Sequence, residues 1–163
     1  MNKLRVLGIS SPFGDDQLGW EVVKLLQQCP ALNQFTSDQL QFICCDRPGM
    51  HLLELMRDAN TVFLIDAVKT DSVCGTLHRF KNQEIETVNS PLSSHALGVA
   101  NAIKMGRALD ELPSNLILYG IEIGDTYDQS HLSKHIIKAV KTLSEQITND
   151  ILQCLHAPAS KRL

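Results

Sequence analysis

The run Thr61–Val68 constrains the fold of this chain more than any other stretch, because it is aliphatic and β-branched almost throughout. A continuous apolar run of this length is typical of a strand buried on both faces, as in the centre of a parallel sheet. Its single carboxylate, Asp66, then lies at the carboxyl end of the strand, where open α/β sheets bind ligands. The run therefore predicts an α/β protein with a candidate site at the carboxyl ends of its strands.

Strands and helices alternate along the rest of the chain. Buried strands are predicted at residues 3–9, 40–46 and 115–123, a shorter edge strand with one wet face at 75–80, and a long loop at 81–90. Helices are predicted from Leu18 to near Pro30, from 52 to 58, from the segment 91–95 to Leu109, and from 132 to 155. This order implies a three-layer α/β/α sandwich with a mostly parallel, twisted sheet and right-handed crossovers.

Length and composition predict one domain at residues 1–155 with a loose tail at 156–163, because 163 residues suffice for one core. The 44% hydrophobic and 20% charged residues are those of an ordinary globular protein. The formal charge of -3, without a dense basic run before residue 160, argues against nucleic acid as a partner. No apolar segment approaches the roughly 20 residues needed to span a bilayer, so no membrane partner is expected.

The amino-terminal segment and the cysteines indicate a cytoplasmic protein. The first apolar run stops at Gly8 and two serines, which fits a first strand better than a signal peptide. The 5 cysteines are odd in number and show neither a CxxC pair nor zinc-finger spacing, so reduced thiols are expected. Cys44 and Cys45 lie in an apolar strand and are predicted to be core residues instead of nucleophiles.

Acidic residues follow each of the first three predicted strands. Asp15 and Asp16 lie in the first loop, Asp46 ends the second strand and Asp66 ends the third. The carboxyl ends of parallel strands meet at one edge, so these side chains and His95, at the start of a helix leading to the last strand, are expected there. Two carboxylates and an imidazole suit a divalent transition metal such as nickel, zinc or iron, with coordination positions left open. The sequence therefore predicts a functional metal site.

Each of these residues also has a structural explanation that the sequence leaves open. Asp15 or Asp16 would cap the first helix, where a carboxylate accepts hydrogen bonds from free backbone N–H groups. Asp66 would bind backbone amides in its own turn, and His95 would be an exposed residue of a first helical turn. The spacing alone does not decide between these interpretations and a metal site.

Other chemistries have less support. His131 and His135, at i and i+4 on the last helix, could ligate a metal, but no third ligand is evident near them, which favours a solvated helix face. The chain contains neither a GxSxG nucleophile elbow nor a GxxxxGK[ST] phosphate loop. Gly8 stands without the further glycines of a dinucleotide fingerprint.

Several short motifs occur in the order of one known family. They are Val6–Ile9 followed by Gly14–Gly19, then Phe63–Val68, Gly75–Leu77, Ser94–Gly98 and Tyr119–Glu122, with Leu132–Ser133 before the final helix. With these motifs the chain resembles the nickel-iron hydrogenase maturation proteases over nearly its whole length.

The resemblance implies a single α/β/α peptidase domain with a phosphorylase/hydrolase-like fold. It also implies an endopeptidase that removes a short carboxyl-terminal extension from a hydrogenase large-subunit precursor after nickel insertion. The metal-contacting residues of the family correspond to Asp16, Asp66 and His95, which become the expected catalytic and metal-binding residues. Nickel is expected to arrive with the precursor, and other divalent metals would fit the same ligands. It would serve as a specificity check, or as a Lewis acid that polarises the scissile carbonyl or activates water.

Two loops depart from the family pattern. Ser10–Pro12 replaces the Gly-Asn-Pro that usually follows the first strand, and Asp46–Met50 replaces an Asp-Gly-Gly-Thr after the second. Asp46 is retained and is a possible substrate contact. The glycine and threonine that usually follow this aspartate are not retained. The altered loop leaves open a non-catalytic metal-binding assembly protein of the same fold. A general small-ligand α/β protein is a third possibility if no metal binds.

Overall fold

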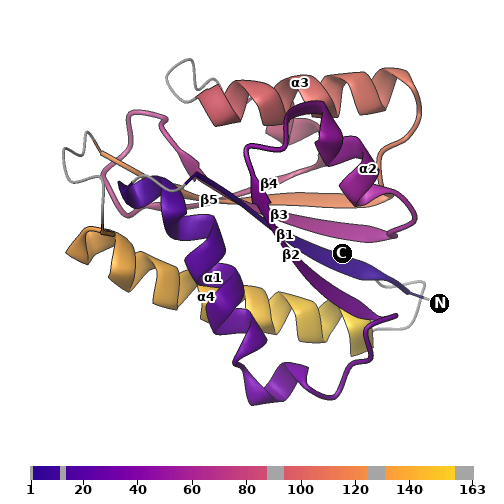
Figure 1. Ribbon diagram of the computed structural model, residues 1–163, viewed down its shortest axis with the longest axis horizontal. Helices are drawn as coiled ribbons and strands as arrows, with labels where there is room; N and C mark the ends of the chain where they lie inside the picture. The colour runs from indigo at the N-terminus through magenta and orange to yellow at the C-terminus, as the bar shows by residue number, and fades with distance from the viewer. Residues whose placement is uncertain (1, 12–13, 88–93, 125–130, 157–163) are drawn as a thin grey trace.

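The computed structural model describes residues 2–11, 14–87, 94–124 and 131–156, with the backbone alone at Thr87 and at 94–97. The strands are β1 (Leu4–Ser10), β2 (Leu40–Asp46), β3 (Thr61–Val68), β4 (Leu77–Lys81) and β5 (Asn115–Glu122). The helices are α1 (Leu18–Gln27), α2 (Leu52–Met56), α3 (Ser94–Ala108) and α4 (Lys134–His156), with 3₁₀ helices η1 (Gly14–Gln17), η2 (Pro30–Leu32), η3 (Gly49–His51) and η4 (Asn82–Thr87). The strands form one sheet in the order β2-β1-β3-β5-β4 (Figure 1).

β3 is the central strand of this sheet, as its sequence predicts. It pairs in parallel with both β1 and β5, and all its residues are buried. β1 also pairs in parallel with β2, whereas β4 runs antiparallel to β5 at the edge. The mostly parallel sheet and the predicted edge strand are therefore confirmed.

Helices cover both faces of the sheet, so the three-layer prediction is confirmed (Figure 1). Phe63 and Ile65 pack with residues of α1 and α4 in one hydrophobic cluster. Val62 and Leu64 pack with residues of α2 and α3 in the other. Successive residues of a strand point to opposite faces, so Asp66 lies on the face that α2 and α3 cover.

Two glycines allow α1 to approach the sheet unusually closely. A Cβ atom on Gly8 would lie 2.5 Å from the carbonyl oxygen of Gly19. A Cβ atom on Gly19 would lie 2.5 Å from the carbonyl oxygen of Ile9 and 2.9 Å from that of Ile65. The first turn of α1 therefore rests on the backbones of β1 and β3, one residue before Asp66. This packing holds η1 at the carboxyl end of β3, and the two elements are in contact.

Some sequence predictions need correction. Residues 82–87 form η4 within the predicted long loop, and Cys44 is exposed because β2 is an edge strand, whereas Cys45 is buried as expected. α4 extends through His156, whose ring centroid lies 5.3 Å from that of Phe35, so this residue is not part of a tail. Residues 157–163, the rest of the predicted tail, lie outside the described residues. None of the described helices is both long enough and apolar enough to cross a membrane.

Candidate functional site

Asp66 is a buried carboxyl group at the carboxyl end of the central strand. Its side chain is buried with a relative exposure of 3%, and its Oδ1 accepts a hydrogen bond from Ala67 N–H at 2.8 Å. Burial raises the pKa of Asp66 well above its ordinary value, and the negative charge of Asp16 raises it further. The ionised form is therefore costly at this position unless a cation offsets the charge.

The two acids of the first loop have different surroundings. Asp15 is buried and accepts hydrogen bonds from Ser133 N–H at 2.8 Å and from Ser133 Oγ–H at 3.2 Å, so it binds the segment just before α4. Asp16 is partly buried, and its Oδ2 accepts a hydrogen bond from Ser11 Oγ–H at 3.4 Å. Neither aspartate occupies the capping position of α1, which is Gln17. Asp16 is the acid whose charge acts on Asp66.

His95 lies in the first turn of α3, and its side chain is outside the described part of the structure. α3 begins on the same side of the molecule as the carboxyl ends of the parallel strands (Figure 1). Gly98 confirms this position, since a Cβ atom there would lie 3.7 Å from Cα of Gly49 in η3, shortly after β2. The backbone therefore starts the helix that carries His95 at the predicted edge.

Asp46 belongs to the same edge but not to the immediate surroundings of Asp66. It is exposed, and its Oδ1 lies 2.8 Å from Nε of its neighbour Arg47. β1 separates its strand, β2, from β3. Its predicted contact with substrate stays a prediction.

Within the described residues, no three His, Cys, Asp or Glu side chains are grouped so that they could hold a metal ion. The structure thus brings Asp16 near Asp66 and leaves the full set with His95 as a prediction. His135 is exposed on α4, as expected for a solvated helix face, whereas His131 is exposed but lies before α4, which begins at Lys134, so the prediction that both share one helix is wrong.

The family follows from comparison with known proteins. The family model described as HycI, hydrogenase maturation protease, matches residues 21–150. The chain belongs to the hydrogenase maturation protease family. Asp66 and His95 fall inside the matched range, and Asp16 lies just before it.

Two curated relatives and one solved structure are similar to this family member. It is 24% identical over 123 residues to the hydrogenase expression/formation protein HupD of Thiocapsa roseopersicina, a match covering 74% of this chain but only 54% of that relative's length. It is 25% identical over 122 residues to the hydrogenase 2 maturation protease of Escherichia coli, covering 73% and 72% of the two chains. Its fold is similar to that of the hydrogenase maturating endopeptidase HybD from E. coli, with a TM-score of 0.77, 22% identity and 89% coverage of each chain.

The structure of this maturation protease family member also shows polar residues that sequence reasoning missed. Glu122 ends β5 with a relative exposure of 1%. Its Oε2 accepts a hydrogen bond from Thr70 N–H at 2.7 Å, its Oε1 accepts one from Thr70 Oγ–H at 2.6 Å, and Oε1 also lies 3.1 Å from Nε2 of His78. Glu122 ends an apolar strand much as Asp66 does, and this similarity in the sequence could have identified Glu122 as a candidate. No sequence pattern could have predicted its contact with His78, because that contact depends on the register of β4.

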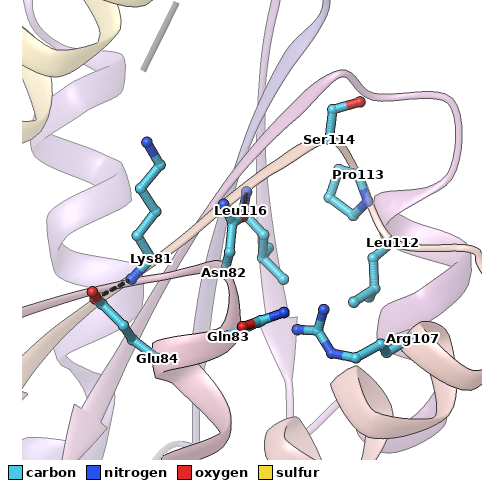
Figure 2. A pocket seen from close by; sticks show the side chains of 9 residues that line it. All are labelled: Lys81, Asn82, Gln83, Glu84, Arg107, Leu112, Pro113, Ser114 and Leu116. Atoms are coloured by element: carbon cyan, nitrogen blue, oxygen red, sulfur yellow. Dashed lines mark hydrogen bonds between the residues drawn. The ribbon is translucent and has the colours of Figure 1, made fainter.

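A pocket of about 530 Å³ lies at the start of β5, the end opposite to Glu122. Figure 2 shows the residues that line it: Lys81, Asn82, Gln83, Glu84, Arg107, Leu112, Pro113, Ser114 and Leu116. Asn82 Oδ1 accepts a hydrogen bond from Leu116 N–H at 3.0 Å, so the pocket adjoins the start of β5. It is therefore separate from the candidate site at Asp66.

Proposed function

We propose that the protein is a cytoplasmic endopeptidase that removes the carboxyl-terminal extension of a nickel-iron hydrogenase large-subunit precursor after nickel insertion. One observation carries the proposal beyond family membership. Asp66, buried at the end of the central strand, has Asp16 near enough to raise its pKa further. Paired carboxyls at the carboxyl edge of an α/β sheet form a site that a cation would stabilise.

The nickel in this proposal is part of the substrate. Asp16, Asp66 and His95 would contact it, since carboxylate and imidazole are ligands that suit nickel and three of them leave positions for the precursor's own groups. When bound, the metal supplies Lewis-acid polarisation of the scissile carbonyl. The rigid strand holds Asp66 in place, and the Ala67 N–H orients its carboxyl group.

The same geometry explains how a precursor without nickel would be rejected. A nickel-free precursor would bring no positive charge to the two acids and so would not reduce the desolvation cost of Asp66 or its repulsion by Asp16. Binding of the nickel-free form therefore costs free energy that the nickel-loaded form recovers. On this basis the pair of acids serves as the nickel check.

The test compares processing of nickel-loaded and nickel-free precursor by the purified protein, with loss of the extension measured by mass spectrometry. Cleavage of the loaded form alone is expected. Equal cleavage of both forms, or of neither, would rule out the nickel check. The variant His95→Ala is expected to lose processing and still unfold cooperatively, and wild-type activity in this variant would remove His95 from the site.

A non-catalytic assembly protein is the second candidate, and the loop after β2 is the feature that favours it. Asp46 pairs with Arg47, the first residue that departs from the family pattern in this loop. An assembly protein would form a stable complex with the precursor without reducing its mass. The same mass spectra therefore separate the two functions.

A further inference from the structure

Three lysines form one row on the exposed side of the amino-terminal half of α4. Lys134, Lys138 and Lys141 lie at positions i, i+4 and i+7, a spacing that places them on one side of an α-helix, and all three are exposed. We call these three residues the lysine stripe. No acidic residue of α4 precedes Glu145, so this part of the helix is positive although the whole chain carries a formal charge of -3.

The lysine stripe has no counter-charge of its own. None of its three ammonium groups forms an ion pair with a described residue. Its members also repel one another, because like charges three or four residues apart destabilise a helix. Lys134 lies in the first turn, where the positive end of the helix dipole disfavours a cation. Charges that are unfavourable in the free protein are expected where they serve a function, such as binding.

A pocket of about 250 Å³ adjoins the lysine stripe, between α4 and the segment 74–77 that leads into β4. Lys138 lines this pocket together with His135 and Thr142, and none of the described residues that line it is acidic. An ammonium group beside a hydroxyl provides donors that suit a carboxylate. The pocket therefore favours an acidic group from a partner.

The lysine stripe lies at the same edge of the sheet as the candidate site. α4 begins on the side of the molecule where the parallel strands end (Figure 1). Ser133, the residue before Lys134, donates two hydrogen bonds to Asp15, which is adjacent to Asp16. A typical protein–protein interface covers about 800 Å² on each partner. A protein bound at Asp16 and Asp66 is therefore expected to reach the first turns of α4 as well.

An exposed apolar side chain lies beside the lysines. Ile137 has a relative exposure of 56% and lies three residues after Lys134 and four before Lys141, so it is their neighbour on the helix surface. Protein interfaces combine apolar contacts with a polar, charged rim. A nucleic acid fits this edge less well, because the acids Asp16 and Asp66 would repel its phosphates. The surface therefore favours an acidic protein segment as its partner.

We propose that the lysine stripe and Ile137 form a docking surface for an acidic segment of the hydrogenase large-subunit precursor. Lys138 binds one carboxylate at the pocket, and Lys134 and Lys141 attract the neighbouring acidic groups. The identity of the partner rests on the proposed function. The precursor brings nickel to the two acids of the candidate site and carboxylates to the stripe. Two patches of opposite charge at one edge select a single orientation of the precursor.

The variant Lys138→Glu tests the lysine stripe at its central residue. The association rate constant for nickel-loaded precursor is measured by surface plasmon resonance. At about 50 mM salt it is expected to fall about tenfold, because an attraction that steers the encounter becomes a repulsion. The difference from wild type should shrink to about twofold at about 0.5 M salt, where charges are screened. An unchanged rate constant, or a loss that does not depend on salt, would overturn the proposal.

Two further variants serve as controls. Lys104→Glu changes the net charge equally, at an exposed lysine of α3 on the opposite face of the sheet that forms no ion pair with a described residue. It should leave the association rate constant within about twofold of wild type, and Lys138→Arg, which keeps the charge, should do the same. A loss in Lys104→Glu equal to that in Lys138→Glu would assign the effect to net charge and overturn the docking surface.

Stability separates docking from a structural role of Lys138. Lys138→Glu converts two like-charge pairs, with Lys134 and Lys141, into opposite-charge pairs. Its melting temperature is therefore expected to rise by about 1–3 °C, while its association with the precursor becomes slower. A lower melting temperature would show that Lys138 is paired with an acid of its own chain and would overturn the proposal.

Binding also separates failure of this inference from failure of the proposed function. Slower association of Lys138→Glu alone supports the docking surface, even if wild type cleaves nothing and the protease proposal fails. Equal rate constants in wild type, Lys138→Glu and Lys104→Glu overturn the docking surface, even if wild type cleaves the precursor. Absence of precursor binding by wild type would overturn both proposals.

Vesicles of phosphatidylglycerol test an anionic lipid surface as the other occupant. Wild type is expected not to bind them, because the acids at the same edge repel lipid phosphates. Vesicle binding that Lys138→Glu abolishes, with precursor binding unchanged in that variant, would assign the lysine stripe to a lipid surface and overturn the proposal.

Discussion

Asp15 and Asp66 are two buried aspartates near the same edge of the sheet, with relative exposures of 2% and 3%. Asp15 accepts hydrogen bonds from both the backbone and the hydroxyl of Ser133 and so connects η1 to the segment before α4. Asp66 lies near a second acid, Asp16, and its pKa is raised by burial first and by that charge second. Burial alone therefore does not identify a functional carboxylate. The surroundings do, because Asp15 accepts two hydrogen bonds from Ser133, whereas Asp66, which accepts one from Ala67 N–H, also lies near the negative charge of Asp16.

The largest expected effect is the loss of precursor processing when the charge of Asp66 is removed. Asp66→Asn keeps the size and the acceptor for Ala67 N–H but removes the charge that would contact nickel. The kcat/KM for nickel-loaded precursor should fall by at least about 100-fold, about 2.7 kcal/mol of transition-state stabilisation. Asp15→Asn is the matched control and should change kcat/KM far less. Equal losses in the two variants would erase the distinction between these acids.

The next effect comes from the packing that brings Asp16 to Asp66. Gly19→Ala places a methyl group 2.5 Å from the carbonyl oxygen of Ile9 and 2.9 Å from that of Ile65, so α1 must move away from the sheet. The free energy of unfolding should fall by about 1–3 kcal/mol, as for other overpacked sites. Urea denaturation measures this change.

Processing by Gly19→Ala should fall as well, because η1 moves with α1. Gly98→Ala is a suitable control, since its Cβ would lie at an ordinary 3.7 Å from Cα of Gly49. A stable Gly19→Ala variant with full activity would show that the close approach of α1 does not position Asp16.

A smaller effect is expected when Asp15 loses its carboxylate. Asp15→Ala leaves the partly buried Ser133 N–H and hydroxyl without their acceptor, which should lower the free energy of unfolding by about 1.5 kcal/mol. Ser133→Ala removes the hydroxyl alone and should cost less. Urea denaturation of both variants measures the difference, and a neutral Asp15→Ala would contradict the structural role.

The smallest expected effect is a pH dependence of stability in the free protein. The pKa of Asp66 in the folded state is raised above its ordinary value of 3.8, so the folded state holds the proton more tightly than the unfolded state. Stability therefore falls as pH rises from about 4 through the raised pKa. Asp66→Asn has no carboxyl group to ionise at this position and so lacks this loss of stability. Its melting temperature should exceed that of wild type at pH 7 and approach it below pH 4. A difference in melting temperature that is independent of pH would exclude burial of the charge as its cause.

Much of the fold could be predicted from local patterns. The apolar run of β3 and the alternation of strands and helices led to the correct sheet class, because burial on both faces requires continuous apolar sequence. Prediction failed where a neighbour decides the outcome. Cys44 and Cys45 look alike in sequence, yet one is exposed because β2 is an edge strand. The segment 82–87 is polar and still forms η4.

The candidate site, too, could be predicted from the sequence only in part. The positions of Asp16 and Asp66 at a common edge followed from chain order, since parallel strands with right-handed crossovers present their following loops together. The different roles of Asp15 and Asp16 did not follow, because Ser133 is far away in sequence and reaches Asp15 only when α4 packs on the sheet. Glu122 and His78 were missed for the same reason.

By itself the sequence determined that β3 would be central, that Asp66 would end it, and that the chain resembles the maturation proteases. Those properties are local, since they depend on which residues are apolar, which are charged and in what order they occur. The tertiary structure decided that Asp15 binds Ser133, that Gly8 and Gly19 bring α1 against the sheet, and that His78 shares a row with Asp66. These depend on strand register and helix packing, which arise only when distant segments bury their apolar surfaces against one another.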